Sequence, residues 1–226
     1  PEWIVNYLCE EYGEDETERI FEGFLKADRG VSVRCNVSKA EPQEVYDMLK
    51  KQGISVKKSE LFDYAFSIDD FDRLQDVEAL KKGYIQVQDF SSILAGHIPE
   101  IKGGENIIDI CAAPGGKTLH IADRLNDRKL NGGGKIISCD LTDAKTALIK
   151  ENVERNGFEN VSVVKNDALA FKKEWEDTAD IVIADLPCSG LGVIGKKCDI
   201  KYKTSIEDIN ALSEIQREIL KNVSRY

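Results

Sequence analysis

The residues best suited to chemistry lie around a glycine-rich turn near the middle of the chain, in the stretch DICAAPGGK at 109–117. The apolar residues Ile107, Ile108 and Ile110 are typical of a buried strand. Pro114–Gly116 interrupts it before a helical pattern that continues from Lys117 to about Arg124. Such a turn presents backbone N–H groups and the positive end of a helix. The spacing fits neither the dinucleotide fingerprint GxGxxG nor the P-loop fingerprint GxxxxGKS/T, so we expect a ligand site of another kind.

Each of the three predicted strands that follow the turn ends in an acidic residue. Asp140 ends the run KIISCD, 24 residues past Gly116, which is near the spacing at which Rossmann-type units place an acid on ribose hydroxyls. Asp167 ends VSVVKND and Asp185 ends DIVIAD. One such acid alone is usually a turn former or a helix cap. Three of them behind one glycine-rich turn favour a shared site at the carboxyl ends of the strands.

Strands alternate with helices through this region, which indicates parallel pairing with right-handed crossovers. Helical periodicity covers Ala144–Asn156, with Gly157 as its C-cap, and a long amphipathic helix is expected over Ser205–Ser224. We therefore expect an α/β fold with a Rossmann-like sheet over 89–226. The last predicted strand, at 180–185, would form an apolar edge that could promote self-association.

Two shorter regions precede this sheet. Residues 1–30 form a helical segment, with helices expected at Pro1–Tyr12 and Asp15–Lys26 and a break at Asp28–Gly30. Residues 31–88 are expected to form a small α+β subdomain. The expected elements after residue 30 are strands at Val31–Asn36, Ser55–Lys58 and Ala65–Ile68, and helices at Pro42–Gln52, Leu74–Leu80 and Asp89–Ala95, the last of which opens the larger domain.

Composition restricts the class of protein. The net charge is −10, which argues against a general nucleic-acid binder. No apolar run reaches membrane-spanning length, and the first residues do not resemble a signal peptide. No two cysteines are spaced as in a CxxC motif, and His97 and His120 cannot complete an ordinary set of zinc ligands with them. We therefore expect a reduced, cytoplasmic protein without a metal site.

Several stretches taken together resemble one family. DICAAPGGKT, the strand end SCDLTDAK, Asn166-Asp167, and ADLPCSGLGV followed by DIKY are similar to motifs of the Nol1/Nop2/Sun (Fmu) family of RNA cytosine-5 methyltransferases. The resemblance covers almost the whole chain. It implies S-adenosyl-L-methionine as cofactor, ribosomal RNA as substrate, and an RNA-recognition-like subdomain at 31–88. Members of the family continue with further strands, so the methyltransferase sheet of this chain is expected to be truncated at its C-terminus.

The resemblance also implies roles for single residues. Asp140 would bind the ribose hydroxyls, Asp167 the adenine amine, and Asp185 the N3 and exocyclic amine of the target cytosine. Asp109 is expected to be structural or near the amino group of the cofactor. The residues expected to contact the cofactor are Cys111, Ala112, Ala113, Pro114, Gly115, Gly116, Lys117, Asp140, Asp167 and Asp185.

Asp185 and Cys188 are the expected catalytic residues. A thiolate that adds to C6 of cytosine makes C5 nucleophilic enough to accept a methyl group. In the RNA family the attacking cysteine belongs to a Thr-Cys pair that this chain lacks, and the Pro-Cys cysteine, here Cys188, assists product release. In DNA cytosine-5 methyltransferases the Pro-Cys cysteine itself attacks. On the family assignment, the 226-residue form is expected to be inactive.

Four lysines that follow the PCSG turn are candidates for contacts to RNA phosphates, although such a cluster is often only a solvated loop. They are Lys196, Lys197, Lys201 and Lys203. Two alternatives to a ribosomal RNA methyltransferase stay open. One is a form that binds the cofactor or RNA without turnover, and the other is a member of the same family that acts on transfer RNA.

Overall fold

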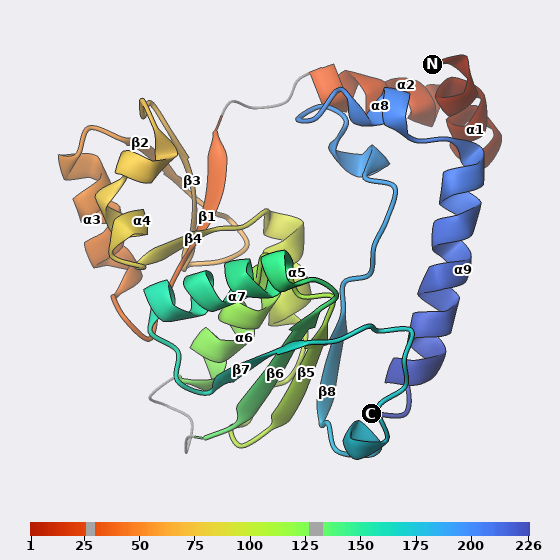
Figure 1. Cartoon of the computed structure of the whole chain (residues 1–226). Coiled ribbons are helices and arrows are strands. Elements are labelled where there is room, and N and C mark those ends of the chain that lie inside the picture. The colour runs from red at the N-terminus through yellow and green to blue at the C-terminus, as the bar shows by residue number, and fades with distance from the viewer. Residues whose placement is uncertain (26–29, 127–132) are drawn as a thin grey trace. The chain divides into compact units, whose positions relative to one another are not determined.

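The parallel sheet expected in the second half of the chain is present in the structure (Figure 1), which is a computed structural model. It describes residues 1–25, 30–126 and 133–226. The chain divides into two compact units, one formed by 1–29 with 187–218 and the other by 30–186 with 219–226. The expected helix end at Lys26 and the break at 28–29 lie outside the described residues.

The larger unit contains four parallel strands in the order β7-β6-β5-β8. Their bounds are β5 (Asn106–Ile110), β6 (Lys135–Asp140), β7 (Val161–Lys165) and β8 (Ile181–Ala184). Ile107 on β5 pairs with Ile136 on β6 and with Ile181 on β8, so apolar residues align across the sheet. The expected α/β fold with a Rossmann-like parallel sheet is confirmed. β8 forms one edge of the sheet among the described strands.

The two faces of this sheet pack against different segments. Ile107 belongs to the core that contains α6 (Gly116–Leu125) and α7 (Asp143–Asn156), whereas Ile108 packs with the end of α9 (Ile206–Val223). Successive strand residues point to opposite faces, which explains this division. Figure 1 shows α6 and α7 on the same face of the sheet.

The ends of two predicted helices agree with the structure to within one residue. α7 begins at Asp143, where Thr142 Oγ1 accepts a hydrogen bond from Lys145 N at 3.3 Å, and it ends at Asn156, followed by the C-cap Gly157, whose φ is 74°. Glycine adopts this left-handed conformation without steric cost, so the predicted C-cap is confirmed. α9 occupies the range expected for the amphipathic helix and buries Ile219 and Val223, whereas Leu220 is 49% exposed.

A small antiparallel sheet of order β2-β3-β1-β4 forms the first part of the larger unit. Its elements are β1 (Val31–Cys35), α3 (Pro42–Lys51), β2 (Ser55–Lys58), β3 (Ala65–Asp69), a 3-10 helix at Leu74–Asp76, α4 (Glu78–Lys81) and β4 (Ile85–Val87), and α5 (Phe90–His97) follows. The β-α-β-β-α-β order is that of a ferredoxin-like fold. The single helix expected over Leu74–Leu80 is wrong, because Val77 adopts an extended conformation between the two short helices.

Buried polar contacts join the small sheet to α6 and α7. The side chain of Arg34 on β1 is fully buried and donates Nη1 to Asp123 Oδ2 at 2.6 Å. Asp123 also accepts from the backbone N–H groups of Val37 at 3.0 Å and Ser38 at 2.8 Å. Further hydrogen bonds link Asn36 with Asn156 and Gln86 with Arg155. We call these eight residues the polar seam: Arg34, Asn36, Val37, Ser38, Gln86, Asp123, Arg155 and Asn156.

The smaller unit is mainly helical. Its elements are α1 (Glu2–Tyr12), α2 (Glu14–Leu25), a 3-10 helix at Leu191–Val193, α8 (Ile200–Lys203) and the first part of α9. Phe21 and Phe24 pack edge to face with ring centroids 6.2 Å apart. A Cβ at Gly195 would approach the carbonyl oxygen of Phe24 to 2.7 Å, so the loop after Leu191–Val193 runs directly against the end of α2.

Candidate functional site

The glycine-rich turn connects β5 to α6 and is tied to the neighbouring strand. Ala112 N donates to Cys139 O at 2.8 Å, and Gly115 N donates to Ala112 O at 2.7 Å. Gly115 has a φ of 105° and Cys111 one of 62°, so the chain turns sharply before α6 begins at Gly116. Apart from its chain neighbours and the backbone of its own helix, no atom of the described residues lies within 4 Å of the position that a Cβ on Gly116 would take. The first turn of α6 therefore faces open space that a ligand can occupy.

Asp140 ends β6 directly beside this turn. Its Oδ2 accepts from Ala113 N at 3.0 Å, and its Oδ1 accepts from Leu141 N at 2.7 Å. Lys145 Nζ lies 2.9 Å from the same Oδ1. The carboxylate is only 3% exposed, and these contacts compensate its burial. The structure thus brings Asp140 and the turn together, as the strand order predicts.

A second carboxyl group, Asp109, is completely buried beneath the turn. Thr118 Oγ1 donates to Asp109 Oδ2 at 2.5 Å and lies 2.8 Å from Ser138 Oγ, while Asp109 Oδ1 has no partner among the described residues. Burial raises the pKa of Asp109 to about 7. The sequence analysis did not single out Thr118 or Ser138. The available signal was their polarity inside an apolar helix face and an apolar strand.

Asp185 lies just beyond β8 and forms an ion pair with Lys117. Lys117 Nζ is 2.6 Å from Asp185 Oδ2 and 3.5 Å from Ser92 Oγ on α5. The Lys117 side chain is 18% exposed and that of Asp185 is 61% exposed, so the carboxyl group reaches solvent while the ammonium group is largely covered. This pairing, which the sequence analysis did not anticipate, joins two of the predicted site residues.

Asp167 follows β7 and is exposed. Its Oδ1 accepts from Leu169 N at 3.0 Å, as a turn-forming aspartate does, and the preceding Asn166 donates its backbone N–H to Asp140 O at 2.9 Å. The structure shows Asp167 at the same end of the sheet as Asp140 but without a direct contact between their side chains.

Cys188 and the four predicted RNA-contacting lysines belong to the smaller unit. Cys188 is exposed, and Gln216 Nε2 holds the preceding residue by donating to Pro187 O at 2.7 Å. Lys203 pairs with Asp199 at 2.7 Å, and Lys201 Nζ lies 5.2 Å from the centre of the Tyr202 ring. Lys201 and Lys203 lie on the short helix α8, and Lys203 is already paired with an acid.

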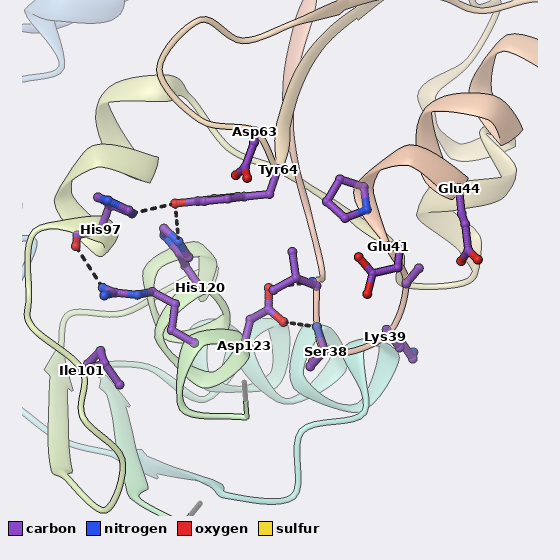
Figure 2. A pocket seen from close by; sticks show the side chains of 14 residues that line it. Ser38, Lys39, Glu41, Glu44, Asp63, Tyr64, His97, Ile101, His120 and Asp123 are labelled. Carbon is purple, nitrogen blue, oxygen red and sulfur yellow. Dashed lines mark hydrogen bonds between the residues drawn. The ribbon is translucent and has the colours of Figure 1, made fainter. Parts of the chain in front are cut away.

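A separate pocket of about 630 Å³ lies between the small sheet and α6 (Figure 2). Tyr64 OH lies 2.9 Å from His97 Nδ1 and 3.4 Å from His120 Nε2 on its wall. Arg124 Nη1 is bonded to the carbonyl oxygens of Gly96, His97 and Pro99. None of the residues predicted to bind the cofactor lines this pocket.

Two further findings concern the described residues alone. No helix among them combines the length and apolar character needed to cross a bilayer. Within the same residues, no group of three or more His, Cys, Asp or Glu side chains is placed to hold a metal ion.

Two family profiles match the chain. The family described as 16S rRNA methyltransferase RsmB/F matches residues 98–225, and the ferredoxin-like domain of RsmF/B-like methyltransferases matches residues 1–74. The second match agrees with the strand order of the small sheet.

Curated proteins and a solved structure are similar over long stretches. The probable ribosomal RNA small subunit methyltransferase B of Bacillus subtilis (strain 168) is 33% identical over 225 residues, 99% of this chain and 49% of that protein. The tRNA (cytosine(72)-C(5))-methyltransferase of Pyrococcus horikoshii is 33% identical over 147 residues, 65% of this chain and 36% of that protein. The crystal structure of PH0851 has a TM-score of 0.92 and 32% identity, and the match covers 100% of this chain and 50% of that one.

The chain spans about half the length of the curated relatives that it matches from end to end. The first profile alone covers more than half of the chain and includes every strand of the parallel sheet. With the motifs, the sheet order and the profiles in agreement, the chain belongs to the 16S rRNA methyltransferase RsmB/F family.

Proposed function

We propose that this chain carries the cofactor site of an enzyme that uses S-adenosyl-L-methionine to methylate C5 of a cytosine in small-subunit ribosomal RNA. The observation that carries the proposal is the group at the carboxyl ends of β5, β6 and β8. There Asp140 is bonded to the turn Cys111–Lys117, and Lys117 is paired with Asp185. The relatives named as ribosomal RNA small subunit methyltransferase B support ribosomal RNA as the substrate class.

The residues present fit this cofactor. A ribose diol needs hydrogen-bond acceptors, and Asp140 is a carboxylate held in place by two backbone N–H groups. The space beside Gly116 leaves the turn open to a ligand, and the exposed Asp167 offers an acceptor for an exocyclic amine. S-adenosyl-L-methionine would supply an electrophilic methyl group there.

Asp185 and Lys117 are suited to the cytosine. A carboxylate oxygen of Asp185 can accept a hydrogen bond from the exocyclic amine. When a thiolate adds to C6, negative charge develops at N3. The proton held between Lys117 Nζ and Asp185 Oδ2 is available to neutralise this charge. Lys117 also fixes the carboxyl group in position, because its own side chain is largely covered.

The assignment of Cys188 rests on the family resemblance. Its exposure is compatible with contact to RNA, and we assign it to product release and not to the first attack on C6. The lysines at 196, 197, 201 and 203 would contact phosphates. Such contacts are independent of sequence and weaken as salt is raised.

Methyl transfer to purified RNA tests the proposal. The protein as encoded in its source genome should transfer tritium from methyl-labelled S-adenosylmethionine to small-subunit ribosomal RNA, and bisulfite sequencing should locate the product at one cytosine. Lys117→Met and Asp185→Asn should each lower the rate by about 100-fold or more. Lys150→Met removes an exposed charge from α7 and serves as the matched control. Wild-type protein that leaves every cytosine unmethylated would contradict the proposal.

Transfer RNA is the second candidate substrate, because a tRNA cytosine-5 methyltransferase is among the similar proteins. The same assay with total transfer RNA separates the two. Label in transfer RNA alone would replace the substrate in our proposal. Cofactor binding without label in either RNA would favour the form that binds without turnover.

A further inference from the structure

Lys117 is held by more than its ion pair with Asp185. Its ammonium group has three N–H donors. One donates to Asp185 Oδ2 at 2.6 Å, and another donates to Ser92 Oγ on α5 at 3.5 Å. Lys117 lies in the first turn of α6, where the helix dipole disfavours a cation. The position of its ammonium group is therefore set by these two acceptors and not by its own helix.

Ser92 uses its hydroxyl oxygen for Lys117 alone. Among the described residues its Oγ has no other hydrogen bond, although a serine in a helix often bonds to the backbone of the preceding turn. Ser92 is half-buried in the first turn of α5, whereas its neighbour Ser91 is exposed. The two adjacent serines thus differ in environment, and the contact with α6 belongs to Ser92.

Buried hydrogen bonds fix the turn of α5 that carries Ser92. Gln88 is only 5% exposed, its Nε2 donates to Ser92 O at 3.2 Å, and its Oε1 accepts from Arg34 Nε at 3.1 Å. Arg34 is in turn paired with Asp123, which lies on α6 as Lys117 does. This chain of contacts starts and ends on α6. The polar seam therefore determines, through Gln88, where Ser92 lies relative to Lys117.

The ion pair with Asp185 cannot by itself fix the direction of the ammonium group. The side chain of Asp185 is 61% exposed, and an ion pair that reaches water constrains a flexible lysine only weakly. A second acceptor on a rigid helix restricts the rotation of the ammonium group and leaves its third N–H donor for a ligand. The Nζ–Oγ distance is long, but contacts of catalytic groups often shorten in the reacting complex.

We propose that Ser92 is a positioning residue for Lys117, whose hydroxyl oxygen accepts from Nζ and keeps the ammonium group directed at Asp185 and the target cytosine. Ser92 acts through Lys117 and exchanges no proton with the substrate itself. This inference rests on the proposed function where it concerns the cytosine. The contact between Ser92 and Lys117 can be tested without RNA.

Proton–nitrogen NMR correlation spectra of the lysine ammonium groups test the contact itself. Lys117→Met identifies the signal of Lys117 by its loss. Ser92→Ala should shift this signal or broaden it through faster proton exchange with water, whereas Ser91→Ala, the matched control, should leave it in place. A Lys117 signal that is the same in the wild type and in Ser92→Ala would overturn the inference. So would a wild-type spectrum from which Lys117→Met removes no signal, because an ammonium group held by two acceptors should exchange slowly enough to be observed.

Methyl transfer by the protein as encoded in its source genome tests what the contact does. Ser92→Ala should lower kcat by about 3- to 10-fold, the effect of losing one long hydrogen bond, at an unchanged KM for S-adenosylmethionine. Ser92→Thr keeps the hydroxyl group and should restore most of the rate. In a Lys117→Met background, Ser92→Ala should cause no further loss, because Ser92 acts only through Lys117.

The outcomes separate the inference from the proposed function. Equal losses from Ser92→Ala with and without Lys117 would overturn the inference, because that pattern reports a general disturbance of α5. A Ser92→Ala enzyme with the kcat of Ser91→Ala, in a protein that loses activity on Lys117→Met, would also overturn the inference and leave the proposed function standing. A wild type that methylates no RNA, while its Lys117 signal responds to Ser92→Ala, would overturn the proposed function and support the contact.

Discussion

Removing the carboxyl group of Asp123 should destabilise the protein strongly, because it leaves a cation buried without its partner. The side chains of Arg34 and Asp123 are 0% and 2% exposed, and burial already lowers the pKa of Arg34 despite the neighbouring carboxylate. Breaking a buried pair from one side typically costs about 3–5 kcal/mol. Asp123→Ala also removes the acceptor of two backbone N–H groups. Water can reach the exposed Val37 and replace one of the two lost acceptors. We therefore expect the free energy of unfolding to fall by about 4 kcal/mol in total.

Urea unfolding at 25 °C, followed by circular dichroism, measures this loss as a lower midpoint at an unchanged slope. The loss is a large share of the stability of an ordinary domain, which is about 5–15 kcal/mol. Glu78→Ala is the control, because it removes an exposed partner of Lys82 at 2.6 Å. An exposed pair of this kind should leave the midpoint unchanged.

A double variant separates the uncompensated charge from lost packing. Arg34→Met combined with Asp123→Leu removes both charges and should be clearly more stable than Asp123→Leu alone. The reasoning is refuted if the double variant is as unstable as the single one, or if Asp123→Ala unfolds at the same urea concentration as Glu78→Ala.

Three further predictions concern other parts of the chain. Burial raises the pKa of Asp109 to about 7, so between about pH 4 and 7 the folded protein binds more protons than the unfolded one. The stability of the wild type relative to Asp109→Asn should therefore fall as pH rises, by up to about 1.4 kcal/mol per pH unit. A constant difference between the urea midpoints of the two proteins across this pH range would contradict the prediction. Gly96→Ala should lower stability by about 1–3 kcal/mol in thermal unfolding, because its Cβ would lie 2.3 Å from His120 Nδ1. Gly23→Ala is the control and should not destabilise, since its Cβ would meet no described atom within 4 Å outside its neighbours and its own helix. Cys188→Ala in the protein as encoded in its source genome should accumulate a covalent protein–RNA complex on a denaturing gel, and a variant that binds cofactor and RNA but forms neither adduct nor product would overturn its assignment to product release.

The sheet could be predicted from sequence because its signals are local. Apolar runs of four to six residues end in Asp140 or Asp185, and each run is followed by a turn or a helix with its own cap. These signals gave the parallel strands and placed the glycine-rich turn and Asp140 at the same edge. β4 was not identified as a strand because three residues, Ile85–Val87, carry too little periodicity to be distinguished from a loop.

The contacts that complete the site could not be predicted in this way. Lys117 and Asp185 are 68 residues apart, and Arg34 and Asp123 are 89 residues apart, so no spacing rule connects them. Each of these side chains is unremarkable within its own segment, and only the packing of the elements brings the partners together. Asp167 as an adenine ligand stays a prediction, since its observed contact is that of a turn former.

The polar seam has a consequence for how the small sheet is oriented on α6, the helix that begins at the glycine-rich turn. The apolar residues of the small sheet and those of the parallel sheet form separate cores. Apolar contact is non-directional and tolerates sliding. The hydrogen bonds of the seam depend on angle and distance, so they admit one alignment of β1 against α6. The polar seam therefore fixes how the small sheet is oriented on α6. A ferredoxin-like subdomain transplanted from a relative would dock correctly only if it carried the counterpart of Arg34 and the backbone donors that meet Asp123.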